Sequence, residues 1–224
     1  MRKKVSLIYF ARSNISNLAR ILEDLENERS NFTRYTMFNL YFTLGMQHIL
    51  DTAATDHQAY LIAISVLYGL KDYKKIIFLI TAFTIGHSIA LAASTLEWVS
   101  IPVKLVETAI PITIILAALF NISPLSQKKE GKVNTAYLIT IMFGLIHGLG
   151  FSNYLKELLN QSSEGILMPL LGFNLGVECA QLIIVPFVLF AGYLVKRLFR
   201  LKQEQWKILG SGIALGMAIT IFLS

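Results

Sequence analysis

The sequence predicts an all-α, polytopic membrane helical bundle with about seven transmembrane segments, and three observations support this. Of the 224 residues, 54% are hydrophobic and only 15% are charged, which is more apolar surface than a soluble domain of this size can bury. The apolar residues form long blocks, several of them near the roughly 20 residues that span a bilayer as a helix. These blocks are continuous and lack strict alternation, which favours helices over a β-barrel.

Seven apolar blocks follow one another along the chain. They cover residues 37–50, 57–70, 76–96, 102–122, 135–155, 166–195 and 206–223. The first two are short for complete spans, so we expect tilted helices or a re-entrant hairpin with the sequence DTAATD at its tip. The sixth block contains Pro169 and Pro186 and is too long for one untilted span, so we expect a broken helix there.

The first 35 residues differ in composition from the rest of the chain. They combine the basic sequence MRKK with the polar sequence LEDLENERS, and their one apolar run, VSLIYFA, is cut short by Arg12. This run is too short to span a bilayer. We therefore expect a cytoplasmic N-terminal extension over residues 1–35 and a transmembrane helical domain over residues 36–224.

Basic residues predict the orientation of the chain. The net charge is +6, but the Lys and Arg residues alternate with the apolar blocks and form no continuous stripe, which argues against nucleic-acid binding. If the N-terminus is cytoplasmic and each block returns the chain, only Lys104 and Lys156 lie outside. Cytoplasmic loops are enriched in Lys and Arg. We therefore expect a multi-pass protein of the inner (plasma) membrane, with a cytoplasmic N-terminus and an extracytoplasmic C-terminus.

All four histidines, His48, His57, His87 and His147, lie in or beside apolar blocks. Ionisable side chains are costly in hydrocarbon and tend to mark substrate, ion or proton paths. Cys179 is the only cysteine, so a metal site within this chain must use nitrogen and oxygen ligands. Imidazole and carboxylate are ligands for first-row transition metals such as nickel, zinc, iron and copper.

The segment GMQHILDTAATDHQAYL concentrates four ionisable groups within ten residues. His48 and Asp51 are three residues apart, which puts both on one face of a helix. Asp56 and His57 open the next helix, where the Asp56 carboxylate could instead serve as the N-cap. Capping and metal binding both stay open for Asp56, but four such groups together favour a metal site.

His87 and His147 lie within the third and fifth blocks beside glycines. For either residue alone, helix–helix packing next to small neighbours is an alternative explanation. Two such residues at similar depth, with the short first blocks nearby, favour convergence on one metal site.

The sixth block adds polar companions to the histidines. Asn174 and Glu178 are four residues apart and share a helix face, which Gln181 continues. We expect Glu178 to be a metal ligand. We expect a supporting role around the ligands for four residues: Asn174, Gln181, Glu107 and Ser88.

Five ordered motifs in this chain resemble the HupE/UreJ family of membrane proteins. They are GxxHILD followed by DH, TAFTxGHS, VExxIPIT, FGLIHGLGFS and FNLGVExxQL, and they extend from about Tyr41 to Gln181. The family is associated with uptake of nickel, and of cobalt, for hydrogenase and urease, so the resemblance implies a small metal permease. It implies metal contacts from the first motif at His48, Asp51, Asp56 and His57, and later motif positions at His87, His147 and Glu178.

These observations together predict a permease for a divalent transition metal ion, nickel before cobalt, that uses a His/carboxylate site near mid-membrane. Its expected partners are the metal ion (nickel, cobalt or zinc) and the lipid bilayer, with no nucleic acid; a homo-oligomer is left open. No segment resembles a nucleotide-binding loop, so we expect transport driven by the membrane potential or coupled to protons. Two alternatives use the same ligands: an intramembrane zinc-dependent hydrolase, and a metal-delivery or assembly protein.

Overall fold

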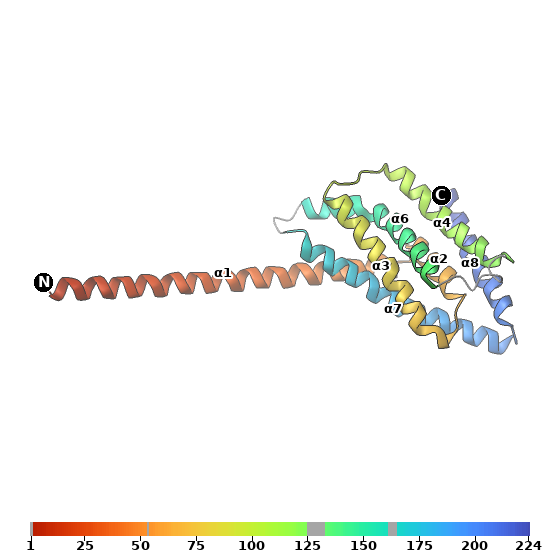
Figure 1. Cartoon of the computed structure of the whole chain (residues 1–224), viewed down its shortest axis with the longest axis horizontal. Helices are drawn as coiled ribbons and strands as arrows, with labels where there is room; N and C mark the ends of the chain where they lie inside the picture. The colour runs from red at the N-terminus through yellow and green to blue at the C-terminus, as the bar shows by residue number, and fades with distance from the viewer. Residues whose placement is uncertain (1, 53, 125–132, 161–164) are drawn as a thin grey trace.

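The computed structural model describes residues 2–52, 54–124, 133–160 and 165–224, and within these ranges every regular element is a helix. The predicted all-α class is therefore confirmed. In chain order the helices are α1 (Arg2–Leu50), α2 (Thr55–Ser65), the short 3-10 helix η1 (Leu70–Asp72), α3 (Tyr73–Thr95), α4 (Val103–Ile122), α6 (Val133–Asn160), α7 (Leu167–Leu198) and α8 (Gln203–Leu223) (Figure 1).

Five segments of the described chain are long and apolar enough to cross a membrane. They are Leu70–Thr95, Val103–Ile122, Ala136–Leu158, Leu167–Leu198 and Gln203–Leu223, and they correspond to the last five predicted blocks. The predicted total of about seven segments is not confirmed. The reason is α2, whose 11 residues make a helix of about 16 Å, roughly half the thickness of the hydrocarbon core.

α1 enters the bundle beside α7 and runs parallel to it. Gly172 of α7 packs against the backbone of Phe38, and Gly176, one turn later, packs against Phe42. Along this contact the residue numbers of α1 and α7 increase together, so the two helices run in the same direction. α1 therefore enters the bundle at the end where α7 begins. Ahead of the bundle, α1 projects outwards as a single helix without a break at residues 35 and 36 (Figure 1).

α2 runs in the same direction as α1 and carries the chain the rest of the way across the bundle. Near its end, the Ala63 carbonyl accepts a hydrogen bond from Asn121 in the last turn of α4. The following Val66 carbonyl accepts one from Gln203, the first residue of α8. α1 and α2 therefore cross the bundle once, in place of the predicted pair of spans or hairpin. The chain enters the bundle at the end where Ser224 lies.

Two parallel helix pairs pack through glycines in the same manner. A Cβ atom added at any of these glycines would overlap the backbone of the facing helix. The positions are Gly45, Gly172 and Gly176 in the α1–α7 pair, and Gly86, Gly144 and Gly148 in the α3–α6 pair. The first helix of each pair carries a similar sequence at the contact, FTLG at 42–45 and FTIG at 83–86. Small residues allow this close approach in membrane bundles.

The two pairs run in opposite directions. Thr81 of α3 contacts Glu178 of α7, whereas His87, further along α3, contacts Asn174, which comes earlier in α7. α3 is thus antiparallel to α7, and the α3–α6 pair repeats the α1–α7 pair in inverted orientation. Inverted repeats of this kind are a common plan of membrane transporters, with binding sites at the interface between the repeats.

α7 is one continuous helix of 32 residues, so the predicted break in the sixth block is wrong. Pro169 lies in the first turn, where the backbone N–H has no intrahelical partner to lose. Pro186 lies inside the helix and does not end it. At about 48 Å, the helix is longer than the hydrocarbon core, so it must tilt or extend beyond it.

Candidate metal centre

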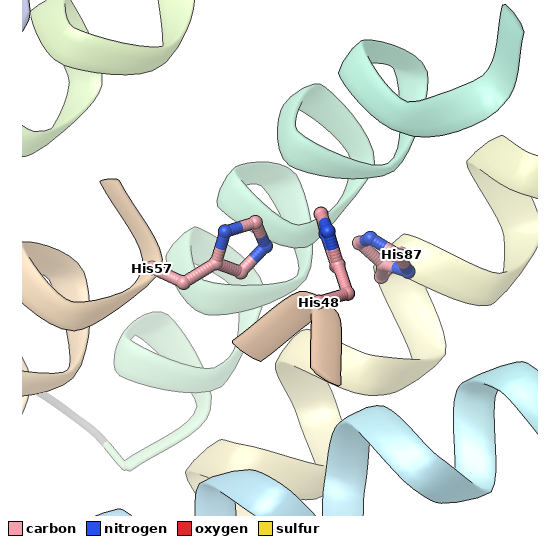
Figure 2. Close-up of side chains that lie close together, drawn as sticks. All are labelled: His48, His57 and His87. Atoms are coloured by element: carbon pink, nitrogen blue, oxygen red, sulfur yellow. The ribbon is translucent and has the colours of Figure 1, made fainter. Parts of the chain in front are cut away.

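Three histidines from three helices meet in the interior of the bundle. His48 lies in the last turn of α1, His57 near the start of α2, and His87 in α3 (Figure 2). Each offers one ring nitrogen, and the three nitrogens lie within 4.8 Å of one another. The ring centroids of His48 and His57 are 4.7 Å apart, and that of His87 lies 6.3 Å and 6.2 Å from them respectively.

His147 of α6 borders this group. Its ring centroid lies 5.2 Å from that of His57, and the residue is 1% exposed. The four histidines singled out from the sequence are therefore neighbours in space. His48, His57 and His87 form the compact group, and His147 stands next to it.

The interruption between α1 and α2 brings two of these residues together. In a continuous helix, His48 and His57 would lie about 14 Å apart along the axis. Because α1 ends at Leu50 and α2 starts at Thr55, the intervening turn places both imidazoles on the same site. The interruption between α1 and α2 is thus the feature of the fold that brings His48 and His57 to one site.

Hydrogen bonds at Nδ1 orient two of the rings. His57 Nδ1 donates to Asp56 Oδ1 at 3.0 Å, and His147 Nδ1 donates to the Phe143 carbonyl oxygen at 2.9 Å. A carboxylate and a backbone carbonyl only accept, so Nδ1 carries the proton in each ring. Nε2 then carries the lone pair, which is the form that binds a metal.

His87 is held in a similar way by a side-chain amide. Its Nδ1 lies 3.3 Å from Asn174 Oδ1. Asn174 Nδ2 donates to the Leu170 carbonyl at 2.8 Å, which turns the amide oxygen towards the ring. His87 Nδ1 is therefore the donor, and its Nε2 also keeps the lone pair.

The Nε2 atoms of all four histidines are buried and have no hydrogen-bond partner within the described part of the chain. Leaving one buried polar atom unsatisfied costs about 1–3 kcal/mol. Three of these atoms, on His57, His87 and His147, are fixed as acceptors by Nδ1 bonds, and the compact group of His48, His57 and His87 is the arrangement that a bound metal ion would satisfy. Partners that hold the second imidazole nitrogen are typical of metal-binding histidines.

Aromatic side chains enclose the histidines. The Phe151 ring centroid lies 4.2 Å from that of His48, and the Phe173 centroid lies 5.6 Å from it. Phe83 packs against His147 at 5.3 Å. These rings pack directly against the histidine rings. Sequence reasoning missed them, although all three stand within the motifs that contain the histidines or Asn174.

The predicted carboxylates occupy different places. Asp56 contacts the histidine group through His57; it is not the N-cap of α2, because that position is Ala54. Asp51 is exposed, since α1 ends one residue before it. Glu178 lies at the contact between α3 and α7, where its carboxylate accepts a hydrogen bond from Thr81. The structure thus brings one of these three carboxylates to the histidines.

The four residues that we expected to support the ligands also lie in different parts of the structure. Asn174 contacts His87 directly, and Gln181 lies near Thr84 of α3. Ser88 donates to a carbonyl of its own helix, that of Thr84, at 2.7 Å. Glu107 is exposed on α4.

One protein-family model, described as HupE / UreJ protein, matches residues 24–224 of the chain. The match covers every histidine of the site and all of the helices from α2 to α8. No curated protein and no solved structure matches the chain.

Proposed function

This chain belongs to the HupE/UreJ family, and we propose that it is a membrane permease for a divalent transition metal ion, with nickel as the first choice and cobalt as the second. The observation that carries the proposal is the group of four buried Nε2 atoms without partners, three of them oriented through Nδ1. Imidazole nitrogen suits nickel, zinc, copper and iron. The preference for nickel and cobalt comes from the family.

The spacing of the nitrogens suits a site that binds and then releases its ion. Metal–nitrogen bonds of about 2 Å hold two ligands of one ion no more than about 4 Å apart. The nitrogens of His48, His57 and His87 span up to 4.8 Å, so small side-chain movements are enough to close the group around an ion. An ion that is cargo must also leave, which favours ligands that can separate again.

The sides of the membrane follow from the basic residues at the two ends of the bundle. At the end where α7 ends and α3 and α8 begin, the described residues include Lys71, Lys74, Lys75, Lys196, Arg197, Arg200, Lys202 and Lys207. At the opposite end, apart from the N-terminal extension, the described residues include Lys104 near the start of α4 and Lys156 near the end of α6. We therefore assign the first end to the cytoplasm.

This assignment puts Ser224 on the extracytoplasmic side. Because α1 enters the bundle at the same end, it puts the N-terminal extension there too, in contrast to the expectation from the charge of residues 1–35. A divalent ion that enters a cell at a membrane potential of 100 mV gains about 4.6 kcal/mol, so the potential alone can drive accumulation.

Nickel uptake into vesicles tests the proposal. The full chain is reconstituted into vesicles that contain a nickel-sensitive dye, and wild type is compared with His87→Ala and with Glu97→Gln, a change at an exposed position between α3 and α4. We expect uptake by wild type and Glu97→Gln, and none by His87→Ala at equal amounts of folded protein. Full uptake by His87→Ala would remove the histidine group from the transport path.

The rival zinc hydrolase uses the same three imidazoles, so the same preparation is also tested for hydrolysis of lipid amides. Zinc-dependent hydrolysis without any entry of metal into the vesicles would replace the permease by the enzyme.

A further inference from the structure

A group of polar side chains lies at the α3–α7 contact outside the histidine site. Thr81 Oγ1 donates to Glu178 Oε1 at 2.6 Å. Thr84 Oγ1 lies 3.2 Å from Gln181 Oε1. These four residues, Thr81, Thr84, Glu178 and Gln181, are called the oxygen group below, because each contributes a hydroxyl, carboxylate or amide oxygen.

The oxygen group continues from the histidines in one direction. On α7, Glu178 follows Asn174, the partner of His87, by one turn, and Gln181 follows by nearly two. On α3, Thr84 and Thr81 precede His87 by about one and two turns. Both helices therefore carry the group from the histidine site towards the end where α3 begins and α7 ends, the end that we assign to the cytoplasm.

The oxygen group puts polar side chains inside membrane-spanning helices, which is unfavourable in free energy. Gln181 is 0% exposed, and its Nε2 atom has no hydrogen-bond partner among the described residues. Glu178 belongs to a candidate membrane span, and its described contact is a hydroxyl rather than a cation. A carboxylate inside a membrane span is expensive and is typically found on a path for ions or substrates. Helix packing alone does not need a carboxylate in a membrane span.

We propose that the oxygen group is a second cation site, which receives the divalent ion when it leaves the histidines on its way to the cytoplasm. The inference rests on the proposed permease function and extends it by one step. Oxygen ligands suit nickel and cobalt less well than imidazole, so the ion is held more loosely there than at the histidines. Two sites of decreasing strength allow an ion to enter and still leave. The Glu178 carboxylate offsets part of the charge of the ion during this transfer.

Buried apolar side chains lie beyond the oxygen group. Towards the same end, α3 and α7 contribute Ile76, Ile80 and Val185, all buried members of one hydrophobic cluster. Thr81 and Glu178 themselves are half-buried, so the oxygen group lies at the edge of this cluster.

The test separates binding at the histidines from transfer past them. The full chain carrying Glu178→Gln is compared with wild type for Ni²⁺ binding by equilibrium dialysis in detergent and for Ni²⁺ uptake into vesicles. We expect binding within about threefold of wild type and uptake slowed by about tenfold or more, because the intramembrane charge that receives the ion is lost. Glu97→Gln makes the same chemical change at an exposed position between α3 and α4, outside the candidate spans, and is expected to leave both measurements unchanged.

Thr81→Val and Thr81→Ser provide a second comparison, because valine removes the hydroxyl and serine keeps it. We expect slow uptake for Thr81→Val and near-normal uptake for Thr81→Ser. If Glu178→Gln does not fold, this pair decides the question, and equal uptake by the two variants overturns the second site.

The remaining outcomes are also decisive. Normal uptake by Glu178→Gln, with His87→Ala inactive, overturns the second site and leaves the permease in place. Loss of Ni²⁺ binding together with uptake in Glu178→Gln overturns it as well, since Glu178 would then belong to the histidine site. Full uptake by His87→Ala counts against the permease proposal itself.

Discussion

Asp56 holds the imidazole of His57 in the orientation that a metal ligand needs. Its Oδ1 atom accepts hydrogen bonds from His57 Nδ1 at 3.0 Å and from the His57 backbone N–H at 2.8 Å. The His57 side chain is 3% exposed and that of Asp56 is 26% exposed. The carboxylate therefore stands between the solvent-accessible surface and the buried ring, and it makes Nε2 a stronger electron-pair donor.

Replacing Asp56 with Ala should weaken Ni²⁺ binding by about 10- to 100-fold, the range found when partners of metal-bound histidines are removed. The carboxylate also accepts the His57 backbone N–H in the first turn of α2, so thermal unfolding is used to compare equal amounts of folded protein. Isothermal titration of the purified protein with Ni²⁺ measures the change. Asp51→Ala, at an exposed position, should bind within about threefold of wild type. An equal loss in both variants would mean that the Asp56–His57 bond has no special role.

Ni²⁺ binding should weaken as the pH is lowered from about 7.5 towards 5. Only a neutral imidazole can offer Nε2 to a metal, and the unperturbed imidazole pKa is near 6.5. Protons therefore compete with the ion, so affinity is greatest at high pH and is lost as the pH falls. Titrations at several pH values give the slope, which should be shallower in His87→Ala because one competing ring is gone. A Ni²⁺ affinity that rises as the pH falls from 7.5 to 5 would exclude histidine ligands.

The glycines between parallel helices should be far less tolerant of change than glycines facing outwards. A Cβ at Gly176 overlaps the backbone of Phe42, whereas nothing lies within 4 Å of a Cβ at Gly212. We expect Gly176→Ala to destabilise the protein by about 1–3 kcal/mol, as overpacking does. Gly212→Ala should be neutral or stabilising by up to about 1 kcal/mol, because alanine favours helix. Thermal unfolding in detergent compares the two, and equal melting temperatures would refute close packing of α1 on α7.

Both chain ends should be accessible from outside the cell. In a Cys179→Ser background, we expect a membrane-impermeant maleimide to label Ser224→Cys and Arg29→Cys in intact cells. Lys71→Cys should be labelled only after permeabilisation. These expectations follow from the parallel course of α1 and α7 and from the basic residues where α3 begins. Labelling of Lys71→Cys from outside would reverse the orientation, and labelling of only one chain end would contradict the single crossing of α1 and α2.

The sequence by itself determined the helical membrane class and the identity of the buried histidines. Apolar blocks must form helices in lipid, because every backbone N–H and C=O group needs a partner there. The block at 102–122 accordingly became α4 (Val103–Ile122), and the block at 206–223 became most of α8 (Gln203–Leu223). Histidine inside such blocks is rare and costly, so it marks a site wherever the chain folds.

Only the tertiary structure decided how the first two blocks cross the bundle and which carboxylate reaches the histidines. Hydropathy and charge are summed along the chain, so they cannot distinguish a hairpin from two half-length helices laid end to end. That choice depends on Gly45, Gly172 and Gly176, which let α1 and α7 approach in parallel. Asp51 and Asp56 belong to the same motif as His48 and His57, but α1 ends before Asp51, which is exposed, whereas Asp56 is bonded to His57. Packing of helices distant in sequence fixed the site, because a metal centre needs nitrogen atoms within a few ångströms of one another in space, which spacing along the chain does not specify.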